Sequence, residues 1–199
     1  MRVLVVGASG TIGRAIVAEL GQRHEVIAAG RSSGDVRTDI TDAEAIRTMF
    51  ETVGSVDAVV CAAGKVTFAP FEDMGAEDYE VGLKDKLMGQ VNLVLIGRDY
   101  LSDRGSFTLT TGVLDSEPIV QGTSASMVNG AINTFVAAAA IEMPRGQRIN
   151  VVSPGVIEEA MDVYAPYFRG FEPVPAARAA LAYAKSVEGA QTGRVYQVL

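Results

Sequence analysis

The sequence contains no tryptophan, a single histidine, a single cysteine, and only 17 lysines and arginines against 24 acidic residues. Because Cys61 has no partner, an internal disulfide is excluded, and we expect a small buried side chain in a reducing, cytoplasmic environment. His24 has no potential metal ligands nearby in the sequence, so we expect a loop residue and predict no metal site. The net charge of −7, without a basic stripe, argues against a nucleic-acid partner.

Long hydrophobic runs are also missing. The first apolar run, Val3–Val6, is too short for a signal peptide and leads directly into Gly7. No run approaches the roughly 20 residues that cross a bilayer, so we expect no membrane association. Hydrophobic residues nevertheless make up 48% of the chain, which is sufficient for the core of a globular protein.

The chain does contain a regular alternation of short apolar runs and helical segments. Strands are predicted at Val3–Val6, Glu25–Ala29, Val36–Asp39, Asp57–Cys61, Gly105–Thr110, Arg148–Val152 and Arg194–Val198. Helices are predicted at Thr11–Leu20, Asp42–Val53, Ala76–Tyr100, Ser124–Met143 (stopped by Pro144) and Val174–Ser186. This order is typical of an α/β fold with a doubly wound, mostly parallel sheet of about seven strands and helices on both faces. We therefore expect a single Rossmann domain over residues 1–199.

A glycine-rich turn follows the first predicted strand and opens the first predicted helix. It reads Gly7-Ala8-Ser9-Gly10-Thr11-Ile12-Gly13. Glycines at these places permit a tight turn, a close approach of backbone to a pyrophosphate, and close packing of the helix on the strand. The phosphates would then face the unpaired N–H groups of the helix N-terminus. We predict a dinucleotide site formed by Gly7, Ser9, Gly10, Thr11, Ile12 and Gly13, the alternative being a tight turn without a ligand.

The end of the second predicted strand indicates which dinucleotide is bound. A site for NAD usually has Asp or Glu here, to accept a hydrogen bond from the ribose 2′-hydroxyl. This sequence has Gly30-Arg31-Ser32-Ser33 instead. A guanidinium can pair with a 2′-phosphate, and hydroxyls can add donors, so Arg31 and Ser32 favour NADP as the small-molecule partner. The alternative is a solvated arginine in a surface loop.

Three further segments extend the pattern through the chain. Thr38-Asp39-Ile40-Thr41, Cys61-Ala62-Ala63-Gly64 and Ile149-Asn150-Val151-Val152-Ser153-Pro154-Gly155 follow one another at the ends of predicted strands. Together with the glycine turn, they make the chain resemble the short-chain dehydrogenases/reductases, which are NADP- or NAD-dependent oxidoreductases. The resemblance implies that Asp39 lies beside the adenine and that the backbone at Val156–Ile157 binds the nicotinamide carboxamide. The cofactor contacts that it adds are Asp39, Ile40, Ala62, Ala63, Gly64, Pro154, Gly155 and Ile157.

The resemblance fails at the family's catalytic Asn, Ser, Tyr and Lys. In our alignment these four positions are Lys86, Gly112, Thr123 and Met127. A threonine hydroxyl is a far weaker acid than a phenol, and a thioether cannot lower its pKa as an ammonium would. Two alternatives restore part of the set: a slip of one residue supplies the hydroxyl of Thr111, or Lys86 partly replaces the lost lysine.

Three functions therefore remain open: an oxidoreductase with altered catalytic residues, a catalytically silent dinucleotide-binding sensor or regulator, and an oligomeric scaffold without cofactor. Glu159 stands where the family commonly has a threonine against the pyrophosphate, and its charge there would oppose binding unless it turns to solvent. The aromatic segment Glu158–Pro175 is either a lid over an apolar pocket or a cap on the core. The helix Ser124–Met143 is apolar on nearly every face, which predicts a buried helix and a homodimer or homotetramer.

Overall fold

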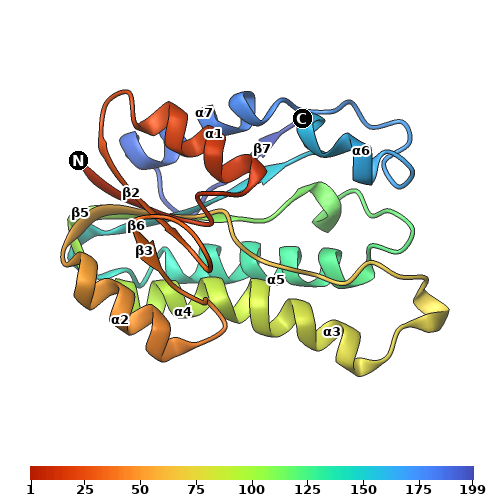
Figure 1. Ribbon diagram of the computed structural model, residues 1–199, viewed down its shortest axis with the longest axis horizontal. Helices are drawn as coiled ribbons and strands as arrows, with labels where there is room; N and C mark the ends of the chain where they lie inside the picture. Colours follow the sequence, from red (N-terminus) through yellow and green to blue (C-terminus); the bar gives the residue numbers. More distant parts are fainter.

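The protein, described over residues 1–199 by a computed structural model, is built on one seven-stranded sheet (Figure 1). The strand order is β3-β2-β1-β4-β5-β6-β7, and every neighbouring pair is parallel. The strands are β1 (Arg2–Val6), β2 (Glu25–Gly30), β3 (Val36–Arg37), β4 (Val56–Cys61), β5 (Leu101–Thr110), β6 (Arg148–Pro154) and β7 (Val195–Val198). The doubly wound fold is confirmed. The order reverses between β1 and β4, and such sheets bind ligands beyond the strand ends at that point.

Helices cover both faces of the sheet (Figure 1). One face carries α1 (Thr11–Leu20) and α7 (Ala176–Glu188), and the other carries α2 (Ala43–Val53), α4 (Met88–Gly97) and α5 (Thr123–Ala139). Alternate residues of β1 point into the two layers: Leu4 and Val6 belong to one buried cluster, and Val3 and Val5 to the other. A strand covered on both faces is apolar throughout, which is why the run from Val3 to Val6 has no polar residue.

Three predicted helices differ from the structure. The segment predicted as one helix from Ala76 to Tyr100 is α3 (Ala76–Gly82), a π-helical turn (Leu83–Leu87) and α4, which ends at Gly97. Helix α5 ends at Ala139, before Pro144 opens a separate 3₁₀ turn. Helix α7 begins at Ala176 rather than Val174, because Val174 forms a parallel bridge with Ile157. Pro175 then precedes the first helical turn, where the lack of an N–H has no cost.

The expectation that α5 is buried on every side was wrong for the single chain. Ile132 and Val136 are buried in the cluster that covers the sheet, and Val128 is buried beside Gly82. In contrast, Met127 is 41% exposed and Ala137 is also exposed. Helix α5 therefore leaves a stripe of small and apolar side chains on the surface. No helix of the protein combines the length and the apolar character needed to cross a bilayer.

Candidate cofactor and substrate site

The glycine turn between β1 and α1 has a shape that only glycine permits at two positions. Gly7 has a φ of 85°, and a side chain there would meet the backbone of Ala62 and Ala63 at 2.8 Å. A Cβ on Gly13 would lie 2.0 Å from the Gly7 carbonyl oxygen. The turn is therefore packed backbone against backbone, which brings the start of α1 to the end of β4.

The first turn of α1 presents free hydrogen-bond donors. The helix has Gly10 at its N-cap and no capping side chain. The backbone N–H groups of Thr11, Ile12 and Gly13 have no acceptor within the protein, since the first bond of the turn runs from the Arg14 N–H to the Gly10 carbonyl. Unpaired donors at the positive end of a helix dipole favour an anion.

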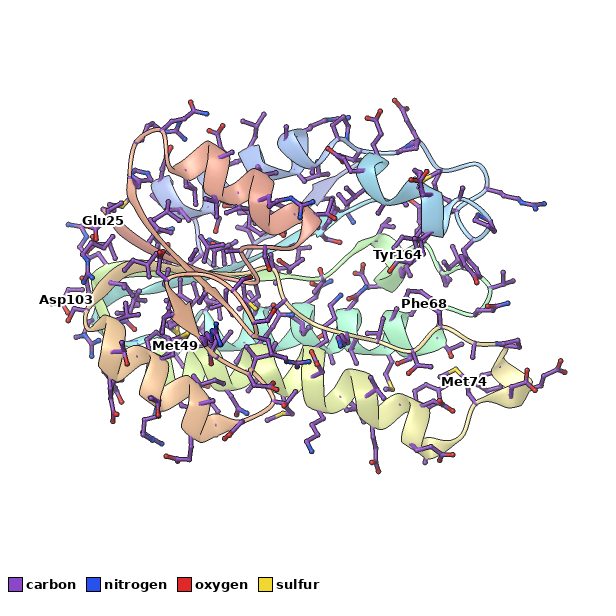
Figure 2. The ribbon with its side chains drawn as sticks, in the orientation of Figure 1. Glu25, Met49, Phe68, Met74, Asp103 and Tyr164 are labelled. Carbon is purple, nitrogen blue, oxygen red and sulfur yellow. The ribbon has the colours of Figure 1, made fainter.

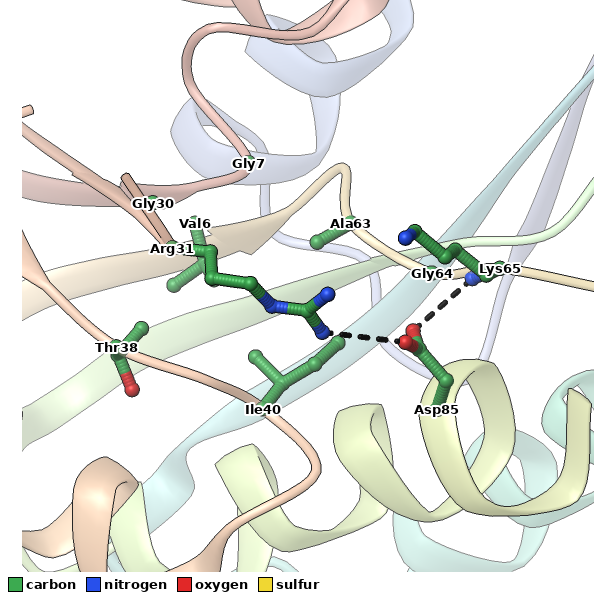
Figure 3. A pocket seen from close by; sticks show the side chains of 10 residues that line it. All are labelled: Val6, Gly7, Gly30, Arg31, Thr38, Ile40, Ala63, Gly64, Lys65 and Asp85. Atoms are coloured by element: carbon green, nitrogen blue, oxygen red, sulfur yellow. Dashed lines mark hydrogen bonds and ion pairs between the residues drawn. The ribbon is translucent and has the colours of Figure 1, made fainter. Parts of the chain in front are cut away.

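A pocket of about 290 Å³ lies at the switch point, beyond the ends of β1 and β2 (Figure 3). The side chain of Arg31 crosses this pocket. Its guanidinium Nη2 lies 3.1 Å from Asp39 Oδ1 and 3.4 Å from Asp85 Oδ2. Asp85 also accepts a hydrogen bond of 3.0 Å from the Lys65 amide (Figure 3). Thus Arg31 reaches this pocket, where it is paired with two carboxylates. The lining residues are Val6, Gly7, Gly30, Arg31, Thr38, Ile40, Ala63, Gly64, Lys65 and Asp85.

Asp39 is held as a carboxylate. Its Oδ1 accepts hydrogen bonds from the Thr41 amide at 2.9 Å and the Thr41 hydroxyl at 2.8 Å. These two bonds, followed by the one from Arg31, lower the pKa of the Asp39 carboxyl. Because the carboxyl also belongs to a local turn, its orientation is fixed before any ligand arrives.

A neighbouring hollow of about 300 Å³ contains a residue that the sequence interpretation missed. It is lined by Ser9, Ser33 and Arg14, among others. The Arg14 guanidinium donates a hydrogen bond of 2.7 Å to the Ser9 carbonyl, so it lies over the glycine turn. Arg14 directly follows Gly13 in the first turn of a predicted helix, and this place in the sequence could have identified it as a residue of the site. Ser32, which we predicted to contact the cofactor, lines neither of these two pockets.

A third pocket, of about 220 Å³, lies where the resemblance places the nicotinamide. Its lining includes Ile12 and Gly64 from the predicted cofactor residues, together with the segment from Pro154 to Ile157. Aromatic rings form one wall: Phe68 and Tyr164 have ring centroids 5.9 Å apart, and Tyr164 and Phe168 6.1 Å apart. Figure 2 shows Phe68 and Tyr164 at the same end of the molecule. Residues of the aromatic segment Glu158–Pro175 thus line the pocket as well as capping the core.

The residues of α5 that face this third pocket are not the ones we aligned. Ala125 and Asn129, one helical turn apart, line it, and Thr123 and Met127 do not. The hydroxyl of Thr123 lies 2.9 Å from the Tyr79 hydroxyl on α3, and Met127 faces outward. The alignment was therefore shifted by two residues. Neither inward position carries a tyrosine or a lysine.

Lys86 reaches the same pocket from the other side. It lies in the π-helical turn, next to Asp85, and these two neighbours face different pockets. The Lys86 stem packs against Gly64, and its Nζ donates a hydrogen bond of 3.3 Å to the Thr111 carbonyl oxygen. Burial lowers the pKa of the Lys86 ammonium to about 8. π-turns are frequent at functional sites because they redirect side chains in this way.

Gly112 and Asn129 complete the polar part of this pocket. The Asn129 amide donates a hydrogen bond of 3.1 Å to the Gly112 carbonyl, while its Oδ1 is buried and has no donor. The hydroxyl of Thr111, which a slip in the alignment offered as a substitute for serine, donates instead to Asn133 at 3.2 Å. A buried acceptor without a donor is costly unless water or a ligand satisfies it.

Glu159 does not point toward the expected position of the pyrophosphate. Its carboxylate accepts hydrogen bonds of 3.1 and 2.9 Å from the Ala176 amide, so it caps the start of α7. The physical reason is the free N–H at that helix end, which attracts a carboxylate. The nearby N–H groups of Val156 and Ile157 have no acceptor in the protein and remain available to a ligand.

Two remaining expectations concern Cys61 and His24. Cys61 is fully buried at the end of β4, and burial raises the pKa of its thiol to about 12. Such a thiol is a poor nucleophile, which agrees with a packing role. His24 lies 2.9 Å from Glu188 at the surface, and no group of His, Cys, Asp and Glu side chains in the protein is arranged to hold a metal ion.

Known proteins share both the sequence pattern and the fold. A family model described as enoyl-(acyl carrier protein) reductase matches residues 3–196. Versicolorin reductase 1 from Dothistroma septosporum is 27% identical over 195 residues, covering 85% of this chain and 73% of that protein. Tetrahydroxynaphthalene reductase from Pyricularia oryzae is 28% identical over 195 residues, with coverages of 85% and 68%.

Two solved structures are also similar. The protein lin1944 from Listeria innocua is 56% identical, with a TM-score of 0.99 and full coverage of both chains. A small-chain dehydrogenase in complex with NADPH is 27% identical, with a TM-score of 0.89 over 100% of this chain and 96% of the other. The chain therefore belongs to the short-chain dehydrogenase/reductase family of oxidoreductases.

Proposed function

We propose that the protein binds NADP(H) across the switch point of its sheet. The observation that carries the proposal is the glycine turn, which leaves the amides of Thr11, Ile12 and Gly13 without acceptors beside a pocket crossed by Arg31. In that position the amides would hold the pyrophosphate, and Arg31 would leave its carboxylate partners to pair with the 2′-phosphate. The 27% identical relative in complex with NADPH supports this choice of dinucleotide.

The third pocket fits the other half of the cofactor. The free N–H groups of Val156 and Ile157 are suited to a carboxamide oxygen, and the unpaired Asn129 Oδ1 to a ribose hydroxyl. Bound NADP(H) would supply or accept the hydride. Ala62, Ala63 and Gly64 follow the end of β4 and would lie between the two halves of the site. The first two adjoin Gly7 of the glycine turn, Ala63 lines the first pocket, and Gly64 lines both the first and the third.

We infer further that carbonyl chemistry by the family's usual acid is absent. The inward residues of α5 are Ala125 and Asn129, so no phenol with a neighbouring ammonium stands one helical turn apart in this pocket. A catalytically silent dinucleotide-binding protein is the second candidate function, and this lining favours it. We expect little hydride transfer to generic aldehydes and ketones.

Arg31→Ala tests the proposed 2′-phosphate contact. We expect NADPH affinity to fall by about 1–3 kcal/mol, because a charged hydrogen bond is lost, while NADH affinity stays unchanged. The measurement is a fluorescence titration of each dinucleotide. Arg47→Ala, at an exposed arginine on α2, is the matched control and should bind both as the wild type does. Equal losses for NADH and NADPH in Arg31→Ala would contradict the assignment.

The exposed stripe of α5 supports a further proposal, that the protein is a homodimer or homotetramer. Met127 and Ala137 lie on this stripe, and pairing with a second copy would remove it from water. We expect light scattering at micromolar concentration to give an oligomer and Ala137→Glu to shift it toward the monomer. Val120→Glu, at another exposed apolar residue, should leave the mass unchanged. A monomeric wild type would overturn this proposal.

A further inference from the structure

Lys86 is a half-buried cation without an anionic partner. Its Nζ makes one hydrogen bond, to the Thr111 carbonyl, and no Asp or Glu forms an ion pair with it. The residues that line the third pocket include no other charged side chain. Because a charge removed from water is unfavourable unless it is paired, this pocket is electrostatically incomplete.

The groups around Lys86 do not supply the missing charge. Asp85 adjoins it in the chain, but its two oxygens are engaged with the Lys65 amide and Arg31 in the other pocket. Glu159 is held at the start of α7, and Cys61 is buried with a raised pKa. Across the pocket, α6 (Met161–Tyr164) contributes the phenol of Tyr164, and α5 contributes the uncharged Asn129.

The remainder of the pocket is suited to a flat apolar body. Phe68, Tyr164 and Phe168 pack edge to face along one wall, and Val66, Val113 and Leu114 add aliphatic surface. The space of about 220 Å³ is small, so the ligand must be small as well. One cation among aromatic and aliphatic side chains is complementary to one negative charge on an apolar ring.

We propose that this pocket binds a small aromatic monoanion, whose charged oxygen pairs with Lys86 Nζ while its ring contacts Phe68, Tyr164 and Phe168. This inference rests on the proposed function in one respect only: bound NADP(H) would place its nicotinamide at the Val156 and Ile157 amides of the same pocket, and the ring of the anion would lie beside it. Lys86 then determines which compounds enter the site, in either candidate function. The ion pair requires the ammonium form, and the lowered pKa of Lys86, about 8, confines that form to neutral and acidic solution.

Benzoate is the probe, titrated by calorimetry into the full-length protein saturated with NADP⁺. We expect wild-type binding at pH 6.5 and affinity at least about tenfold weaker at pH 9.5, where the unliganded lysine is mostly neutral. Lys86→Met should lose at least about tenfold in affinity at pH 6.5. Lys86→Arg keeps its charge at both pH values, so it should bind benzoate with little pH dependence. Lys84→Met, at an exposed lysine of the same turn, should behave as the wild type.

A parallel titration of every variant with NADPH separates this inference from the proposed function. Normal NADPH binding with benzoate affinity that is absent, or indifferent to Lys86→Met, would overturn the anion site. If Lys86→Met loses NADPH affinity and the wild type binds no benzoate, Lys86 serves the cofactor. This result would also overturn the anion site. If the wild type binds no NADPH, the proposed function fails. The benzoate titration is then repeated without cofactor, where dependence on Lys86 supports the site and independence overturns it.

Discussion

Gly13→Ala should strongly weaken cofactor binding and destabilise the fold. The new methyl group would lie 2.0 Å from the Gly7 carbonyl oxygen and 2.9 Å from Ala8, and both are backbone contacts that cannot rotate away. Helix α1 must therefore move from β1. We expect a loss of about 3 kcal/mol in the free energy of unfolding, at the upper end for overpacked sites. Displacing two or more amides from the pyrophosphate should weaken NADPH binding on the order of 100-fold.

Gly130→Ala is the matched control for this substitution. Gly130 is also helical, in α5, and a Cβ there would meet nothing within 4 Å. Alanine at this position should be neutral or stabilise the protein by up to about 1 kcal/mol, from helix propensity. Urea unfolding and NADPH fluorescence measure both effects. Normal NADPH binding by Gly13→Ala would show that the turn does not hold the cofactor.

Ala125→Tyr combined with Asn129→Lys should create reductase activity with NADPH and benzaldehyde, about 10²–10⁴-fold above the wild type, the usual contribution of a positioned acid. Both positions line the third pocket and lie one helical turn apart. The phenol would enter the space near Gly112, and the ammonium beside it would lower the phenol's pKa.

Thr123→Tyr combined with Met127→Lys is the control, because it introduces the same side chains at positions that do not line the pocket. It should gain no activity. Reductase activity in this control, with none in the variant that carries Ala125→Tyr and Asn129→Lys, would show that our assignment of the inward face of α5 is wrong. NADPH oxidation followed by absorbance distinguishes the two variants directly.

The sequence predicts those parts of this protein that depend on neighbours along the chain. The parallel strands were evident because a strand buried on both faces is continuously apolar, as from Val3 to Val6. The glycine turn was evident because its shape excludes side chains at Gly7 and Gly13. Arg31 was placed near its pocket because it directly follows β2.

The parts that the sequence could not predict depend on contacts between distant segments. The inward face of α5 was misassigned by two residues, since a helix that is apolar nearly all round does not indicate which side is buried. Glu159 was misjudged because its partner, the Ala176 amide, lies 17 residues away. Arg31 and Asp85 are 54 residues apart, and no proline interrupts the predicted helix Ala76–Tyr100 at the π-turn that carries Asp85 and Lys86.

We expect the glycine turn and Arg31 to form one site for NADP(H). A fluorescence titration of the purified wild-type protein with NADPH and with NADH measures whether they do. We predict saturable binding of NADPH, at least about tenfold tighter than that of NADH, because only the former offers a 2′-phosphate to the guanidinium. Equal affinities for the two dinucleotides, or binding of neither, would contradict the account.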